Sequence, residues 1–361
     1  MVPSHGAGSR PAIAFITDAV RVAGSEVWLL ETLPRLRAAG LEPSVYFPPH
    51  PGLDAFTARF SEAGIRVERY ADWEELAHQT AALDLRIVQA GNPQTYTALL
   101  PRLTRPRLVL SHDQMRFFYP LGLEALYRAL FALSKARAWR AADGVLTVSS
   151  WAAEFLHSLG LSQAVGLFNG VDPQRFRPAT PAERVQLRAT FGFNRFTVLY
   201  PARLSPEKNH WALLGTARRT PEYRYVLVGE GELTGLLRRL APGNVEFWGR
   251  RTDLPQLYRA ADTLLQPTLA ENQSLATLEA MASGLPVVTS LIPAQLELIT
   301  PEVTGLALRP VPALLAQALR RLEQTPTLGQ RLGQAAREHV LKHHTLEASA
   351  QRLAQALWHY L

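Results

Sequence analysis

The alternation of strand-like and helix-like segments constrains the fold of this chain more than any other feature of its sequence. Short apolar runs rich in branched and aromatic residues recur between longer amphipathic stretches in both halves. Such alternation predicts parallel β-sheets covered by helices on both faces, the doubly wound α/β class. The strand-like runs of the first half are residues 12–17, 43–48, 65–70, 85–90, 107–112 and 144–149. Those of the second half are residues 196–202, 223–231, 244–249, 262–268, 285–290 and 305–310.

The size of the chain indicates more than one domain. A length of 361 residues with 47% hydrophobic residues predicts about two domains, each with its own core. The alternating pattern breaks near residues 170–182, where glycine and proline residues interrupt it, and then resumes. We therefore expect an N-terminal domain over residues 1–175 and a C-terminal domain over residues 176–344. We expect a last helix, about residues 345–361, to pack back on the N-terminal domain.

Composition excludes several classes of protein. The chain has 0 cysteines, which rules out disulfides, thiolate zinc sites and cysteine nucleophiles. It contains no apolar run near the ~18 residues of a membrane span, and its first residues lack the hydrophobic core of a secretion signal. We therefore expect a cytoplasmic protein, with contact at the inner face of the membrane left open.

The excess of positive charge suggests an anionic partner. The formal net charge is +7, which favours nucleic acid, anionic lipid or a phosphorylated small molecule. Only 19% of the residues are charged, and no zinc finger, helix-turn-helix signature or RNA-binding aromatic motif accompanies the basicity. We therefore expect no nucleic-acid partner.

Polar and charged residues follow several of the strand-like runs. In doubly wound sheets, ligands bind at the carboxyl ends of the strands, where loops and helix N-termini converge. Glu271 and Glu279 frame one such junction, with seven residues between them. Because a strand, a loop and a helix follow one another there, we expect Glu271 in the loop and Glu279 in the helix. The two carboxylates are then free to address different parts of one ligand.

The motifs at these positions resemble a known family. "RLSPEKN" (203–209), "VGEGE" (228–232) and above all "ENQSLATLEAMASGLPVV" (271–288) resemble the donor-binding half of the retaining glycosyltransferases of family 4. "NGVDPQRF" (169–176) resembles the interdomain segment of that family, and "AGSEVWLLETLPRLRAAG" (23–40) resembles its N-terminal loop and helix. The resemblance covers nearly the whole chain. It implies the GT-B fold, in which two doubly wound Rossmann-like domains face each other across a cleft.

The chemistry of sugar transfer explains the basic residues of the second half. Breaking the anomeric bond of a nucleotide-diphosphate sugar leaves a diphosphate whose growing negative charge must be stabilised. The chain contains no Asp-x-Asp pair that would hold a metal ion, so fixed cations and helix N-termini are the alternative. The resemblance assigns Arg203 and Lys208 to the diphosphate. We expect neither a metal nor another cofactor, although both residues have the alternative of being solvated surface charges.

The resemblance also implies the contacts of the donor. Glu279 corresponds to the glutamate that binds the ribose hydroxyls, and Glu271 to the one beside the transferred sugar. Further donor contacts are implied for a set of neighbouring residues, namely Gly24, Gly229, Glu230, Arg250 and Leu275. The chain departs from the usual Glu-Gly-Phe-Gly of the family at residues 271–274. Asn272 and Gln273 either bind the sugar or cap the helix that Ser274 begins.

Two further positions are less specific. His112 ends a strand-like run, and the family places a histidine near this position that hydrogen-bonds the sugar or a leaving oxygen. Its alternative is a packed or capping histidine. Ala23 replaces a glycine beside Gly24. His343 and His344 are adjacent on a helix and point apart, so we expect surface residues rather than a metal pair.

The acceptor is expected to bind the N-terminal domain, where the sequence is less informative. Between Arg102 and Arg140 eight basic residues stand against two acidic ones. They alternate with the aromatic residues Phe117, Phe118, Tyr119, Phe131 and Trp139. The segment is typical either of a membrane-surface patch that serves a lipid-linked acceptor or of an ordinary helix with a basic face and an aromatic core face. The second interpretation is favoured here.

Three functions are compatible with these features. The first is metal-independent, retaining transfer of a sugar from a nucleotide-diphosphate sugar to an acceptor hydroxyl. No carboxylate nucleophile is apparent, so the resemblance favours same-face attack, with the departing phosphate oxygen taking the proton of the acceptor. The alternatives are a nucleotide-sugar epimerase of the same fold and a binding protein that has kept the nucleotide site without transfer.

Overall fold

The computed structural model describes residues 10–22, 24–116, 118 and 123–361, and it divides into two compact units. The first unit contains the chain up to Met115, residues Ala125–Asn169 and residues Leu346–Leu361. The second contains Arg116–Glu124 and Gly170–Thr345. Ala23, Phe117 and Tyr119, which the sequence analysis considered, lie outside the described residues.

The chain enters the second unit at Gly170, a few residues before the boundary expected from the sequence. Val171 and Phe176 are buried in the core of the second unit, which explains why the start of the connecting segment belongs there. The short segment Arg116–Glu124 also belongs to the second unit, and the backbone N–H of Phe118 donates to the carbonyl oxygen of Leu269 at 3.0 Å.

The first unit is built on a parallel sheet of seven strands in the order β3-β2-β1-β4-β5-β6-β7. Its strands are β1 (Ala12–Thr17), β2 (Glu42–Phe47), β3 (Arg66–Arg69), β4 (Leu85–Gln89), β5 (Arg107–Ser111), β6 (Gly144–Thr147) and β7 (Ala164–Gly166). The first six coincide with the strand-like runs of the sequence. β7 was not predicted, because it is only three residues long and its central valine is exposed to solvent.

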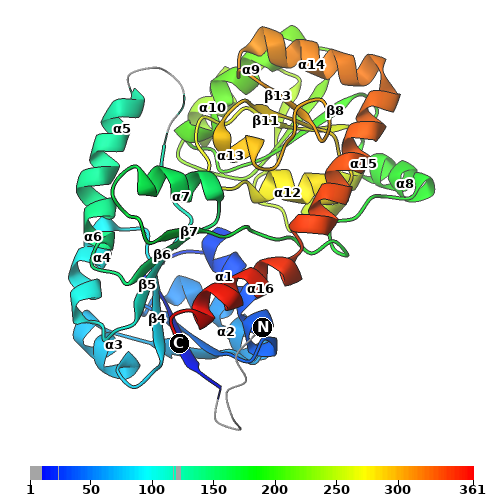
Figure 1. Ribbon diagram of the computed structural model, residues 1–361. Helices are drawn as coiled ribbons and strands as arrows, with labels where there is room; N and C mark the ends of the chain where they lie inside the picture. The colour runs from blue at the N-terminus through cyan, green and yellow to red at the C-terminus, as the bar shows by residue number, and fades with distance from the viewer. Residues whose placement is uncertain (1–9, 23, 117, 119–122) are drawn as a thin grey trace. The chain divides into compact units, whose positions relative to one another are not determined.

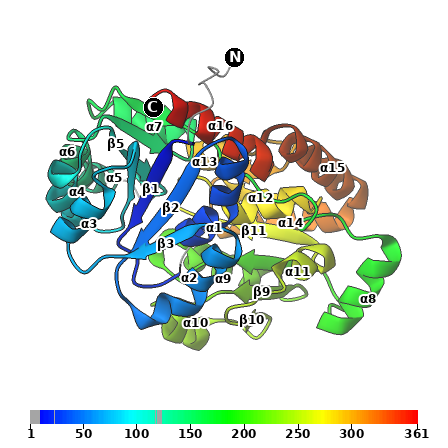
Figure 2. The same cartoon turned by 90° about the horizontal axis from the view of Figure 1, so that it is seen from below.

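Helices cover both faces of this sheet (Figures 1 and 2). They are α1 (Gly24–Ala38), α2 (Asp54–Glu62), α3 (Trp73–Thr80), α4 (Pro93–Leu99), α5 (Leu123–Phe131), α6 (Arg137–Trp139), α7 (Ser150–His157) and α16 (Leu346–Trp358). α16, red in both views, lies beside α1. Leu353 and Leu357 of α16 are fully buried in the same core as Leu29 and Leu33 of α1, so the last helix completes the first unit.

The second unit contains a parallel sheet of six strands in the order β10-β9-β8-β11-β12-β13. Its strands are β8 (Thr197–Pro201), β9 (Arg224–Val228), β10 (Val245–Phe247), β11 (Thr263–Gln266), β12 (Val287–Ser290) and β13 (Leu306–Leu308). All six were predicted from the sequence. In both sheets the strand order reverses beside the first strand, at β1/β4 and at β8/β11, and such switch points are where doubly wound folds bind ligands.

Two apolar cores lie on the two faces of the second sheet. α9 (His210–Arg219), α10 (Thr234–Leu240) and α14 (Pro312–Gln324) pack on one face. α8 (Pro181–Phe191), α11 (Leu254–Ala260) and α12 (Leu275–Ala282) pack on the other, and α15 (Pro326–His343) contributes residues to both cores. The short α13 (Pro293–Leu296) follows β12. The α/β class predicted from the sequence is therefore confirmed in both units.

Of the two histidines at the end of α15, His344 differs from the prediction. His344 is the residue that follows the helix, and it is buried rather than on the surface. Its ring centroid lies 5.3 Å from that of His339. The chain turns inward here because Thr345 forms a β-bridge with Val171, which carries His344 into the interior.

The basic and aromatic segment of the first unit forms a continuous helical stretch from α5 through a short π-helical turn, Ala132–Ala136, to α6. Phe131 and Trp139 are buried, with ring centroids 5.5 Å apart, so these two aromatic residues of the helix belong to the core. Leu126, Leu130 and Leu133 face solvent instead, with exposed fractions of 57%, 57% and 72%. No helix within the described residues is both long and apolar enough to cross a membrane.

Candidate functional site

An ion pair between Lys208 and Glu271 lies at the carboxyl edge of the second sheet. Lys208 ends a short 3₁₀ helix, Pro206–Lys208, that follows β8, and Glu271 lies in the loop after β11. The ammonium Nζ donates to the Glu271 carboxylate, and the two side chains are only 14% and 9% exposed. The structure thus brings together two residues that the sequence analysis had assigned to adjacent parts of one ligand.

The two loops that carry this pair are tied to each other by the backbone. The carbonyl oxygen of Glu207 accepts from the N–H of Leu269 at 2.7 Å and from the hydroxyl of Thr268 at 3.1 Å. The Asn209 side chain donates to the carbonyl of Pro267 at 2.9 Å, and its oxygen caps α9 at the N–H of Ala212. Asn209 has φ of +56°, a conformation that asparagine tolerates better than most residues. These bonds fix the position of Lys208.

Arg203 lies in the same loop but in a different environment. Its guanidinium lies 3.2 Å from the carboxylate of Glu232, and both side chains are about half exposed. Glu230 and Arg250, both expected to contact the donor, pair with each other at 3.4 Å and are also exposed. Exposed pairs of this kind contribute little to stability and exchange partners readily. The guanidinium of Arg203 is therefore free to turn toward an anionic ligand.

Two glycines allow the loop after β9 to lie against the loop after β8. Gly229 has φ of +136°, and a Cβ there would lie 2.1 Å from the carbonyl oxygen of Ala202. A Cβ on Gly231 would lie 2.3 Å from the carbonyl oxygen of Leu204. The N–H of Leu204 donates to the carbonyl of Glu230 at 3.1 Å. Only glycine permits this contact, which places Glu230 and Glu232 beside Arg203.

The loop of residues 271–274 leads directly into α12. Ser274 is the N-cap residue, and its hydroxyl accepts from the N–H of Thr277 at 3.2 Å. Asn272 and Gln273 are buried. The loop has no residue with positive φ, so it needs no glycine. Leu275 packs against the core below, which holds the start of the helix at the sheet edge. Ser274, where the sequence predicted the helix to begin, is therefore its N-cap, and contact of Asn272 and Gln273 with a sugar stays a prediction.

Glu279 lies in α12, as expected, and receives a hydrogen bond from a residue that no motif identified. The hydroxyl of Tyr258, on α11, donates to the Glu279 carboxylate at 2.8 Å. Burial, and then the negative charge of Glu279, raise the pKa of Tyr258 well above its ordinary value, so the phenol stays protonated. A permanent donor on one side orients the carboxylate as an acceptor. The packing of α11 against α12 creates this contact.

A pocket of about 380 Å³ lies at the carboxyl ends of β1, β4 and β5 in the first unit. It is lined by Thr17, Asp18, Ala19, Val20, Arg21, Ser25, Glu26, Gln89, Ala90, Gly91, Asn92, Leu110, His112 and Asp113. Gly24 is the first residue of α1 beside it. His112 was among the residues selected from the sequence, whereas Asp18, just after β1, and Gln89, the last residue of β4, were not.

His112 is held neutral. Burial lowers its pKa from 6.5 to about 4, and the edge of its ring packs against Trp28 with centroids 4.9 Å apart. Its Nε2 is buried and has no hydrogen-bond partner among the described residues. The histidine is therefore both packed, as in the alternative reading, and placed at a pocket that a ligand can enter.

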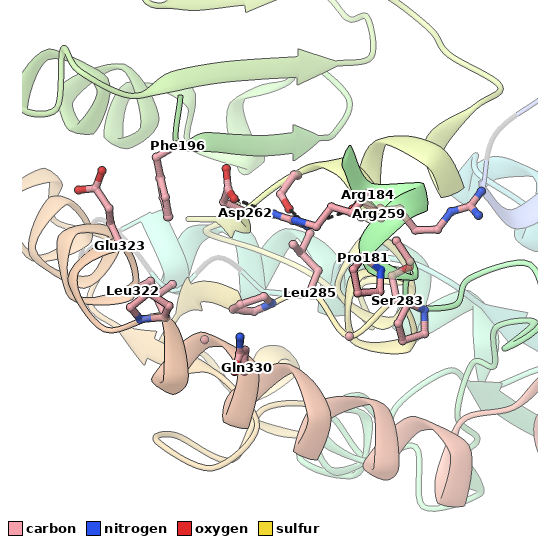
Figure 3. Close-up of a pocket in the computed structure, with 18 residues that line it drawn as sticks. Pro181, Arg184, Phe196, Arg259, Asp262, Ser283, Leu285, Leu322, Glu323 and Gln330 are labelled. Carbon is pink, nitrogen blue, oxygen red and sulfur yellow. Dashed lines mark hydrogen bonds and ion pairs between the residues drawn. The ribbon is translucent and has the colours of Figure 1, made fainter. Parts of the chain in front are cut away.

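A larger pocket, of about 620 Å³, lies elsewhere in the second unit (Figure 3). It includes Phe196, Asp262 and Pro286, which immediately precede β8, β11 and β12, so it lies at the amino edge of the sheet. Arg184 and Asp262 point toward each other there and pair at 2.7 Å (Figure 3). None of the side chains expected to bind the donor lines it, although the end of the 271–288 motif does. Its charged groups are already paired, which is typical of structure rather than of catalysis.

No group of three or more histidine, aspartate and glutamate side chains within the described residues is arranged to hold a metal ion. Lys208 and Arg203, each beside a carboxylate, are cations at the carboxyl edge of the second sheet.

The two parallel sheets, each with its polar residues at the switch point, define a two-domain Rossmann-like protein. The comparisons with known proteins refine this class. The family model "Glycosyltransferase Family 4" matches residues 22–175, and "Glycosyl transferases group 1" matches residues 195–325. The chain belongs to this family of glycosyltransferases, as the sequence motifs indicated.

Relatives and solved structures agree with this assignment. The chain is 29% identical over 322 residues, 83% of its length and 84% of the relative, to a "GDP-mannose-dependent alpha-mannosyltransferase" of Mycobacterium tuberculosis. It is 31% identical over 208 residues to the "GDP-mannose-dependent monoacylated alpha-(1-6)-phosphatidylinositol monomannoside mannosyltransferase" of Corynebacterium glutamicum, covering 52% of this chain and 54% of the relative. The chain spans about half the length of this relative, and also about half the length of a "Putative glycosyltransferase EpsD" of Bacillus subtilis.

Among solved structures, Anabaena Alr3699/HepE in complex with UDP and glucose has a TM-score of 0.80 at 21% identity. The match covers 96% of this chain and 99% of the other. At this identity the likeness shows the fold, which is the GT-B fold of two Rossmann-like domains.

Proposed function

We propose that this chain is a retaining hexosyltransferase that moves a sugar from a nucleotide-diphosphate sugar to an acceptor hydroxyl. The observation that carries the proposal is the buried pairing of Lys208 with Glu271 at the switch point of the second sheet. A lysine held there supplies a fixed positive charge, and the neighbouring carboxylate accepts hydrogen bonds from sugar hydroxyls. Family membership and the donors named for the relatives support the same activity.

Different side chains bind different parts of the donor. Lys208 and Arg203 neutralise the departing diphosphate, each exchanging a carboxylate partner for phosphate oxygens. Glu271, released from Lys208, binds hydroxyls of the transferred sugar. Glu279, oriented by Tyr258, accepts hydrogen bonds from the ribose. The departing phosphate oxygen takes the proton of the acceptor hydroxyl in a same-face attack, so the chain itself need not supply a general base.

We propose that this transfer needs no metal ion. Two side-chain cations at the carboxyl edge supply the positive charge that a metal would otherwise bring to the diphosphate. The sequence also lacks the Asp-x-Asp pair through which some glycosyltransferases hold a metal. His112, neutral in its pocket, can accept or donate a hydrogen bond but carries no charge near pH 7.

The nature of the acceptor is suggested by the first unit and by the relatives. One relative is named for transfer to an acylated phosphatidylinositol mannoside, which is an acceptor anchored in a membrane. In this chain Leu126, Leu130 and Leu133 recur with helical spacing on the exposed side of one helix, and Arg137 follows on the same helix. Such a combination fits the surface of an anionic membrane. We propose peripheral contact through this leucine stripe, which brings a lipid-linked sugar to the enzyme.

A panel of nucleotide sugars without acceptor tests the proposed function against its alternatives. We expect slow release of nucleoside diphosphate and free sugar from one member of the panel. Conversion of the donor into an epimer would instead show an isomerase, and binding without either reaction would show a nucleotide-sugar-binding protein. Absence of binding to every nucleotide sugar would contradict the proposal as a whole.

A further inference from the structure

The pocket of the first unit contains a buried polar side chain that the protein itself leaves unsatisfied. Gln89, the last residue of β4, is 6% exposed and lines this pocket. Neither its carboxamide oxygen nor its nitrogen has a hydrogen-bond partner among the described residues. Leaving a buried polar group unpaired costs about 1–3 kcal/mol, so such a group calls for a ligand or an ordered water.

Two neighbours share this property. His112 has an unpartnered Nε2, and the indole nitrogen of Trp28, whose ring contacts His112, is also buried without a partner. Gln89 and His112, which both line the pocket, offer at least two donors and one acceptor, none of them charged, since burial keeps the pKa of His112 at about 4. The unused hydrogen-bonding capacity at the pocket is therefore neutral and mixed in character.

The carboxylates at the same pocket are already engaged. The carboxylate of Asp18 accepts from the N–H groups of Gly91 and Asn92 at 2.8 and 3.1 Å and from the hydroxyl of Thr95 at 2.7 Å. Asp113 pairs with Lys135 at 2.5 Å. Glu26 is buried and accepts from Ser25 at 3.0 Å. Arg21 also lines the pocket and is exposed, but three carboxylates against one guanidinium leave the lining net negative, which disfavours an incoming phosphate or carboxylate.

We infer that this pocket binds an uncharged sugar ring and that Gln89 is the residue that reads its hydroxyls. A hydroxyl donates one hydrogen bond and accepts others, so it matches a carboxamide that offers both, whereas a phosphate or carboxylate only accepts. The last torsion of a glutamine side chain is soft, which lets the carboxamide turn either atom toward the ligand. The volume of about 380 Å³ falls in the range of small-molecule sites.

This inference rests on the proposed function and defines its acceptor: the sugar that enters this pocket carries no phosphate or carboxylate. An acceptor ring at the end of a neutral glycan or glycolipid fits, and a sugar phosphate or a uronic acid does not.

Binding of simple glycosides to the full chain tests the inference. The uncharged probes are methyl α-glucoside, methyl α-galactoside and methyl α-mannoside, and the anionic probes are glucose 6-phosphate and glucuronate, all followed by saturation-transfer NMR. We expect at least one uncharged probe to bind and both anions to fail. Binding of an anion as tight as that of the best methyl glycoside, or no binding by any uncharged probe, would overturn the inference.

Two substitutions test whether Gln89 itself binds the glycoside. Gln89→Leu replaces an unpartnered amide by an apolar side chain of similar size, which leaves the fold intact. It should weaken the bound glycoside about tenfold, the effect of one lost hydrogen bond. Gln94→Leu, at an exposed position outside this pocket, should leave the affinity unchanged. Equal affinities for wild type and Gln89→Leu would remove Gln89 from the site.

The nucleotide-sugar panel keeps this test distinct from that of the proposed function. If the wild-type chain binds a nucleotide sugar but no methyl glycoside, the assignment of this pocket is wrong and the proposed transfer stands. If it binds the glycoside and no nucleotide sugar, the pocket binds a sugar as inferred and the proposed transfer is wrong.

Discussion

The ammonium of Lys208 and the carboxylate of Glu271 pair between the loops after β8 and β11, the two strands at which the order of the second sheet reverses. Both groups are largely shielded from water, so each depends on the other for charge compensation. In the proposed function, a diphosphate that enters this edge offers Lys208 a doubly charged partner and leaves Glu271 for the sugar. The pair therefore holds both side chains in place before the donor arrives, which limits the reorganisation needed on binding.

Loss of the Tyr258 hydroxyl should weaken nucleotide binding. Tyr258→Phe removes the hydrogen bond that orients Glu279 while keeping the ring in the core, so we expect the affinity for the nucleoside diphosphate to fall about threefold to tenfold. Isothermal titration calorimetry measures it. Tyr223→Phe is the matched control, because it also removes a hydrogen bond from a tyrosine to a glutamate. Neither Tyr223 nor Glu323 is expected to bind the donor. Equal losses in the two variants would count against the role given to Glu279.

Gly229→Ala should disrupt the loops around Arg203. A Cβ at this position would lie 2.1 Å from the carbonyl oxygen of Ala202, so the loops must separate, at a cost of about 1–3 kcal/mol in the free energy of unfolding. We expect turnover to fall with it. A Cβ on Gly235, in α10, meets nothing within 4 Å. Gly235→Ala should therefore be neutral or stabilising by about 0.5–1 kcal/mol. Urea denaturation measures the free energy of unfolding of both variants. A loss for Gly229→Ala alone would show that close backbone contact requires this glycine, and equal changes in the two variants would contradict this.

The fold could be predicted from the sequence to a large extent, because hydrophobic periodicity is a local property. The run of residues 12–17 coincides with β1, and α12 begins at Ser274, its N-cap, where the sequence predicted a helix to start. β7 is too short and too exposed to produce such a pattern. The Lys208–Glu271 pair joins residues 63 positions apart, so their contact requires the folded sheet, although the family resemblance placed both at one ligand.

The roles of Tyr258 and Gln89 were missed because both depend on tertiary packing. Tyr258 lies within a helix whose sequence carries no motif, and only the packing of α11 on α12 brings its hydroxyl to Glu279. Gln89 is one polar residue at the end of an apolar strand. From the sequence alone, such a side chain is as compatible with contact to solvent as with binding a ligand. Its importance appears only when the structure shows that the amide is buried and unpaired.

His112 should make the stability of the protein sensitive to acid. Burial holds its pKa at about 4 in the folded state, below the ordinary 6.5, so the unfolded chain binds the proton more readily. Stability from this group is complete above pH 6.5 and is lost as the pH falls toward 4. The free energy of unfolding of His112→Asn should therefore fall less steeply between pH 7 and pH 5 than that of the wild type. Parallel slopes in urea denaturation would show that the imidazole is not desolvated.

The leucine stripe should bind anionic membranes. We expect the protein to sediment with vesicles that contain phosphatidylglycerol more than with pure phosphatidylcholine, because hydrophobic insertion and the basic charge act together. Replacing Leu126, Leu130 and Leu133 with serine should reduce the bound fraction about tenfold or more. Val185→Ser on α8, at a position of similar exposure, is the control and should bind as the wild type does. Unchanged binding of the triple variant would show that the stripe is not the contact.

The most direct test of the account is turnover of the preferred nucleotide sugar with a chelator present, in the wild type, Lys208→Ala and Lys342→Ala. Lys342 is an exposed lysine on α15 and serves as the matched control. We predict that the wild type and Lys342→Ala keep full activity and retain the anomeric configuration of the sugar. Lys208→Ala should lose about 10²–10³-fold in turnover, the usual effect of removing a group that stabilises developing charge. Activity that disappears with the chelator and returns with magnesium or manganese, or a Lys208→Ala variant as active as the wild type, would contradict the account.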